Sequence, residues 1–185
     1  FEVKVVTSAG KVLASPLRGA GSANPYCADF KPGDNNAEDP QSVGSLITFG
    51  RFRAIHLGDL TKNKEFELMC PSNRIGTVDV FLGLHHGVDT SNSEVMVHAV
   101  RPRVAIMNNG TRKGGAADTF KVLETSPGLE DLWQLHWSYN AAIEQNSAGI
   151  FIANVDDAET LAGVLTAPPG RGRGAAAHVP AHWIK

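Results

Sequence analysis

Apolar and polar residues alternate where the chain begins. Residues 2–13 alternate on either side of a Ser-Ala-Gly turn, which predicts a β-hairpin. A second hairpin is predicted from strands at residues 45–49 and 52–57, which flank a tight Gly-Arg turn. Between the two hairpins, residues 15–43 are rich in glycine, proline, asparagine and aspartate, and they predict a long loop. Loops of this length are usually functional or disordered.

The second half of the pattern alternates helices with strands. Thr61 is a candidate helix N-cap, and the apolar residues that follow it predict a short helix that stops at Pro71. The other predicted elements are a strand at 78–82, a helix capped by Ser91 or Ser93, a strand at 103–107, a helix from Asp118 or Thr119, and strands at 132–137 and 149–153. Strands that alternate with helices predict an α/β or a layered α+β domain.

Composition narrows the class of protein. The 185 residues are 42% hydrophobic and 19% charged, with a net charge of −2. This is an ordinary balance for one globular domain or part of one. The near-neutral charge gives no indication of nucleic-acid binding. No apolar run approaches the roughly 20 residues that a membrane-spanning helix needs.

Cys27 and Cys70 match no zinc-binding spacing. Their positions favour two buried or loop thiols over the alternative, a single disulfide that ties the Cys27 loop to a helix end and needs an oxidising compartment. Residues 165–177 are rich in glycine, proline, alanine and arginine and predict a linker-like loop.

Two strand ends carry the candidate chemistry. Gly58-Asp59 would project a carboxylate from a sheet edge, although an aspartate there could also cap the following helix. His85-His86-Gly87 follows the strand at 78–82, and imidazoles at a strand end suit metal binding or acid–base work. Successive side chains of a strand point to opposite faces, so one histidine could bind a metal while the other faces substrate or core. Residues 88–91 could supply hydrogen bonds to an imidazole nitrogen.

The other histidines are weaker candidates. His136 ends an apolar strand and is the best additional site residue. His56 alternates with apolar neighbours and fits packing or surface, and His98 in mid-helix is expected at the surface.

These motifs resemble a known family. Residues 43–50, 57–59, 84–87 with Ser91, 102–110 and 132–136 are similar to the C-terminal half of a metallo-β-lactamase-fold hydrolase. The likeness is to the soluble hydrolase domain of bacterial DNA-uptake competence proteins and to their stand-alone, often exported, relatives. It implies a four-layer αββα sandwich, with residues 1–164 as the C-terminal half of the domain and residues 178–185 as a late strand beyond the 165–177 loop. It also implies a periplasmic or secreted location.

The resemblance assigns roles to the site residues. It implies two divalent metals, zinc or sometimes manganese, that act on a phosphoester or another small-molecule ester. Asp59 would be the bridging carboxylate and His86 a ligand of the second metal. His85 would face the substrate as a hydrogen-bond donor or general acid, and His136 is a further catalytic candidate.

The chain also departs from the family. The family's main motif, H-x-H-x-D-H, is not found among these residues, and neither is a further histidine ligand before Gly58-Asp59. Two catalytic metals need about three protein ligands each. We therefore expect these residues to be part of a longer protein or to act with an N-terminal half held as a separate chain, to be inactive alone, and to leave a sheet face uncovered. The alternative is a metal-free scaffold or binding module. Where the family has Gly-His, this chain has residues 111–115, and Arg112 and Lys113 there could meet a phosphate or form a solvated loop.

Overall fold

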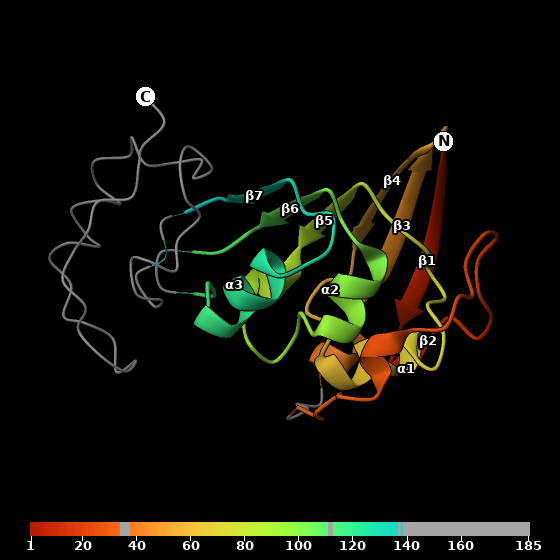
Figure 1. Ribbon diagram of the computed structural model, residues 1–185, viewed down its shortest axis with the longest axis horizontal. Helices are drawn as coiled ribbons and strands as arrows, with labels where there is room; N and C mark the ends of the chain where they lie inside the picture. The colour runs from red at the N-terminus through yellow and green to blue at the C-terminus, as the bar shows by residue number, and fades with distance from the viewer. Residues whose placement is uncertain (34–37, 111–112, 137, 139–185) are drawn as a thin grey trace, which may run out of the picture.

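The predicted strands assemble into one mixed sheet. The computed structural model of the protein describes residues 1–33, 38–110, 113–136 and 138 (Figure 1). In these residues the sheet has seven strands in the order β2-β1-β3-β4-β5-β6-β7. Their bounds are β1 (Glu2–Ser8), β2 (Lys11–Val12), β3 (Gly44–Phe49), β4 (Phe52–His56), β5 (Val80–Gly83), β6 (Val104–Met107) and β7 (Asp131–Gln134).

Helices connect the later strands. The described residues form three α-helices, α1 (Lys62–Met69), α2 (Glu94–Val100) and α3 (Ala117–Glu124), and three short 3-10 helices, η1 (Pro25–Cys27), η2 (Asp39–Gln41) and η3 (Leu84–Gly87). In this part of the chain, no helix is long and apolar enough to cross a membrane.

The sheet is antiparallel on one side and parallel on the other. Strands β1 to β4 pair antiparallel, and both predicted hairpins are present. Strands β4 to β7 pair in parallel, so α1, α2 and α3 are all crossover helices. The expected α/β class is confirmed. The strand expected at 149–153, the loop at 165–177 and the late strand at 178–185 lie outside the described residues.

The core lies between the sheet and the helices, which gather along one side of it (Figure 1). Ile55, Phe81 and Ala105 are register partners on β4, β5 and β6, and all three are buried. The helices bury Leu68, Met96, Val97, Phe120 and Leu123 against them. Each large side chain that is fully buried in this way contributes roughly 1.5–3 kcal/mol.

The opposite face of the sheet carries apolar residues that are less buried. Val5, Leu82 and Ile106 lie in one cross-strand row there, with Ser45 and His56 between them, and none of the five is buried. Val3 and Val5 are 53% and 55% exposed. Apolar side chains left unburied on a sheet face suit association with something else.

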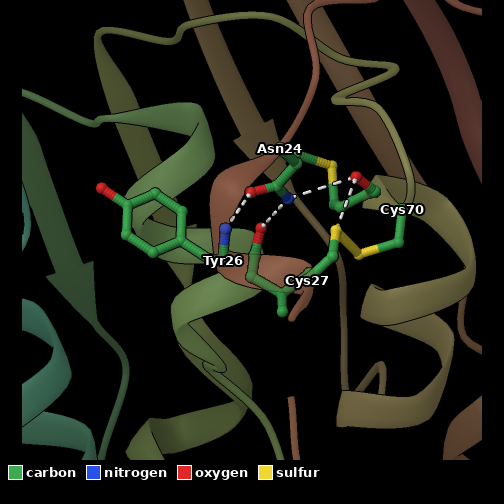
Figure 2. The surroundings of a disulfide bond; sticks show 6 residues. Asn24, Tyr26, Cys27 and Cys70 are labelled. Atoms are coloured by element: carbon green, nitrogen blue, oxygen red, sulfur yellow. Dashed lines mark hydrogen bonds between the residues drawn. A yellow bond between two sulfur atoms is a disulfide. The ribbon is translucent and has the colours of Figure 1, made fainter. Parts of the chain in front are cut away.

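The two cysteines form a disulfide, so the free-thiol interpretation is wrong (Figure 2). The bond joins η1 to the end of α1, with a Cα–Cα distance of 5.9 Å. Beside it, Asn24 Nδ2 donates to the carbonyls of Met69 and Val95 at 3.2 and 2.9 Å. The chain between the two hairpins is therefore tied to α1 and α2, which its polar composition did not indicate.

His98 is also not where the sequence placed it. Its side chain is buried, and the ring packs edge-on against Tyr26 with a centroid distance of 5.1 Å. The Nε2 atom lies 2.8 Å from the Val122 carbonyl, which only accepts hydrogen bonds. His98 therefore joins α2 to α3 and η1, and the surface expectation is wrong.

Candidate metal centre

Asp59 stands just beyond the carboxyl end of β4. The chain leaves the strand through Gly58, whose φ is +60°, and a Cβ there would lie 3.2 Å from Ser42. The Asp59 amide donates to Ser42 Oγ at 3.1 Å, and the helix that follows begins directly after Thr61. The carboxylate faces the histidines at the end of β5, as the functional interpretation of Gly58-Asp59 predicts.

The two histidines lie in a left-handed turn beyond β5. Four consecutive residues, Leu84 to Gly87, have φ between +46° and +79°. For residues other than glycine this costs of order 1–3 kcal/mol each, and such strain is concentrated at functional sites. The strand alternation expected for the pair does not apply here, because His85 and His86 are past the end of the strand. Both side chains turn toward Asp59 as a result.

Each oxygen of the Asp59 carboxylate faces a different imidazole. His85 Nε2 is 3.8 Å from Asp59 Oδ2, and His86 Nε2 is 3.7 Å from Asp59 Oδ1. These distances are too long for hydrogen bonds. They suit atoms that share a metal ion, because two ligands at about 2.0–2.2 Å from one ion lie roughly 3–4 Å apart.

Asp39 joins the group from η2. Its Oδ2 atom is 3.9 Å from His85 Nε2, and the donor atoms of Asp39, Asp59 and His85 all lie within 4.8 Å of one another. Asp39 was not predicted as a site residue from the sequence, because it falls in the long polar loop. The second hairpin could have indicated Asp39. Ser45 pairs with His56, so residues that precede β3 lie beside residues that follow β4.

Hydrogen bonds fix the proton on the His85 ring. Ser91 Oγ donates its single hydrogen to the Leu60 carbonyl at 2.6 Å, so it can only accept from His85 Nδ1, which is 2.7 Å away. In the neutral ring the lone pair is therefore on Nε2, the atom that faces the carboxylates. The expected hydrogen bond from residues 88–91 to an imidazole is confirmed at Ser91.

A hydrogen bond also fixes the position of the hydrogen on a neutral His86 ring. Its Nδ1 atom lies 3.0 Å from the Asn108 carbonyl, which can only accept, so Nδ1 carries the hydrogen. The Asn108 side chain accepts from the His86 amide at 3.2 Å. In its neutral form, each histidine thus presents an Nε2 lone pair to Asp59, as metal-binding histidines do.

Burial lowers the pKa of His85, and repulsion from Lys113, and from His86 whenever that ring is protonated, lowers it further. The carboxylates of Asp59 and Asp39 act in the opposite direction. A lowered pKa keeps the ring neutral at physiological pH, and a neutral ring is the form that binds a metal ion.

A buried carboxylate on α1 supports the loop that holds Ser91. Glu65 is 2% exposed and accepts hydrogen bonds from the Asn92 amide and from the amide and hydroxyl of Ser93, at 2.6–2.8 Å. Burial raises the pKa of Glu65, and the hydrogen bonds from Ser93 and Asn92 oppose that shift. The sequence placed Glu65 only in the first turns of a helix and gave no sign of its burial.

His136 lies further along the same sheet edge. Its carbonyl accepts from Asn109 Nδ2 at 2.6 Å and from Gln134 Nε2 at 2.8 Å, so the residue stands beside the loop that follows β6. Within the described ranges, its imidazole is not part of the group formed by Asp39, Asp59 and His85. Its catalytic role stays a prediction.

No protein-family model, curated protein or solved structure matches the chain at a significant level. What the protein does must therefore be argued from the site. The group of two carboxylates and one imidazole, with the His86 imidazole beside Asp59, fits a divalent cation such as zinc or manganese.

Proposed function

We propose that the chain supplies one side of the metal centre of a hydrolase that acts on phosphoesters. The observation that carries the proposal is the position of Asp59, whose two oxygens each face the Nε2 atom of a different histidine. A carboxylate in this position can bridge two ions, which is the arrangement of two-metal phosphoesterases.

Under this proposal, both histidines are ligands. Asp39, Asp59 and His85 would hold one ion, and Asp59 with His86 would contribute to the second. When bound, such ions activate a water molecule and polarise the phosphoryl oxygen. The protein's part is to keep the hydrogen of each neutral ring on Nδ1, through Ser91 and Asn108, so that Nε2 is left to bind an ion. His85 then has no proton directed at the substrate, so its earlier assignment as general acid gives way to a ligand role.

We further propose that the chain is the C-terminal half of a metallo-β-lactamase-type αββα sandwich. Two features support this. The candidate metal centre lies at the carboxyl edge of the sheet, and the second face of the sheet carries unburied apolar residues such as Val3 and Val5, as an inner face would before a second sheet packs on it. The disulfide suits a periplasmic or secreted protein.

The ligand count favours dependence on a further element. Four side chains are brought together in the described residues, whereas two catalytic metals need about six ligands. An N-terminal half in the same or a separate chain would supply the others. The same lack of ligands also favours the alternative function, a binding module that keeps the fold without catalysis.

Metal titration of the full chain tests the proposal. We expect the metal-free protein to bind Zn²⁺ or Mn²⁺ in calorimetry, and Asp59→Asn to weaken binding by about 100-fold, because a bridging ligand is lost. Asp118→Asn, which removes an exposed carboxylate from α3, is the matched control and should bind like the wild type. Equal binding by all three proteins would refute the metal centre.

A hydrolysis assay separates the two functions. The chain alone should not cleave bis(4-nitrophenyl) phosphate, and it should gain activity when it is combined with an N-terminal half that carries the H-x-H-x-D-H motif. If the combined protein binds metal but stays inactive toward phosphoesters, the binding-module function replaces the enzymatic one.

A further inference from the structure

The loop between β6 and α3 runs against the backbone of the two histidines. The Gly115 amide donates to the His86 carbonyl at 3.0 Å, and the Ala116 amide donates to the Gly87 carbonyl at 2.8 Å. On the other side, the Gly110 amide donates to the Lys113 carbonyl at 2.8 Å. Hydrogen bonds therefore fix the backbone on both sides of Lys113, which lies just before the segment that contacts His86 and Gly87.

Glycine makes this contact possible. Gly114 has a φ of +80°, and a Cβ at this position would overlap the His86 carbonyl. Gly115 also has a positive φ, and a Cβ there would overlap the side chain of Ser138. With any larger residue the loop would have to move away, and Lys113 would move with it.

Lys113 stands beside the metal centre. The residue is exposed and directly precedes Gly114, which lies against the His86 carbonyl. A cation at this place repels a divalent metal, so it does not serve metal binding. It suits an anion that arrives once the metal has reversed the negative charge of Asp39 and Asp59.

We propose that Lys113 anchors the anionic phosphoryl group of the substrate at this centre. The inference rests on the proposed function and deepens it, because it names a residue that selects anionic substrates. A compact ammonium on a flexible stem is a common phosphate-binding group. Lys113 in this role contacts the substrate and is not a metal ligand. Anion binding should then require the loaded metal, since the metal-free site carries two carboxylates.

Two measurements on the full chain test this inference. Free Mn²⁺ measured by electron paramagnetic resonance gives the metal affinity, and the broadening of the ³¹P signal of inorganic phosphate by bound Mn²⁺ gives the phosphate affinity. The variants are Lys113→Ala, Lys113→Arg and Lys121→Ala. The last removes an exposed lysine from α3 and serves as the matched control.

Removal of the Lys113 charge should lower phosphate affinity without lowering Mn²⁺ affinity. Lys113→Ala should lower phosphate affinity about tenfold, since a nearby opposite charge is lost, while Mn²⁺ affinity stays equal or rises. Lys113→Arg should keep phosphate affinity within about twofold of the wild type, because the charge is retained. Lys121→Ala should leave both affinities unchanged.

Two outcomes overturn the inference in distinguishable ways. If Mn²⁺ binds but Lys113→Ala and Lys121→Ala have the same phosphate affinity, Lys113 is not the anchor and the metal centre stands. If the wild type does not bind Mn²⁺, the proposed function fails and the inference fails with it.

Discussion

Replacing Ser91 with alanine tests the central geometric argument. The Ser91 hydroxyl donates to the Leu60 carbonyl and accepts from His85 Nδ1, so it connects the residue next to Asp59 with one of the two histidines. The variant removes both bonds from a residue that is 3% exposed. His85 would lose the partner that keeps its proton on Nδ1, and the Leu60 carbonyl would lose the hydrogen bond that it accepts.

The size of the effect follows from these two losses. A buried polar group left without its partner costs about 1–3 kcal/mol of folding free energy. Loss of the group that orients a metal-binding histidine typically lowers metal affinity 10–100-fold. We therefore expect Ser91→Ala to reduce both stability and metal affinity, by amounts that urea denaturation and metal titration resolve easily.

Ser93→Ala provides the control, because it separates the two effects. Ser93 is also buried and donates through its hydroxyl to Glu65 at 2.6 Å, yet it touches neither histidine. Its loss should cost a similar folding free energy and leave the affinity for Zn²⁺ unchanged. The reasoning is refuted if the two variants lose metal affinity equally, or if Ser91→Ala is destabilised but binds Zn²⁺ like the wild type.

Three other predictions concern the scaffold. Burial raises the pKa of Glu65, so the folded protein binds its proton more tightly than the unfolded chain does. The free energy of unfolding of the wild type, relative to Glu65→Gln, should therefore be greatest below about pH 4.3, the pKa of an unfolded glutamate, and should fall as pH rises through the folded pKa. A difference in urea midpoint between the two proteins that stays constant with pH would contradict this. Reducing the bond between Cys27 and Cys70, which are 43 residues apart, should lower the free energy of unfolding by about 4 kcal/mol on the chain-entropy estimate, seen as a shift of the urea midpoint with reductant. Gly114→Ala should cost at least about 2 kcal/mol more than Gly10→Ala, because both positions have a positive φ but only the first Cβ meets other atoms; equal thermal midpoints would disprove this.

The hairpins and the alternation of strands and helices could be predicted because they depend on local pattern. Both hairpins formed where turn residues separate apolar runs, and the helix after Thr61 begins and stops as its capping residue and Pro71 indicate. Asp59, His85 and His86 were recognised for a related reason. They directly follow apolar strands, and the ends of neighbouring parallel strands meet at one sheet edge.

Long-range contacts could not be predicted in the same way. Asp39 reaches the metal centre because β3 and β4 pair in one particular register, and Glu65 is buried because α1 packs on the turn before α2. The sequence placed His98 at the surface, since helical position alone does not reveal which neighbour covers it. The disulfide likewise depends on two segments that meet only in the folded chain.

The sequence by itself determined which residues are available for chemistry and at which strand ends they stand. The tertiary structure decided how they face one another. A left-handed turn, rather than a strand, directs His85 and His86 together toward Asp59, and hydrogen bonds from other segments set the proton on each ring. The physical reason is that the identity of a ligand is local, whereas its orientation and protonation depend on neighbours that are distant along the chain.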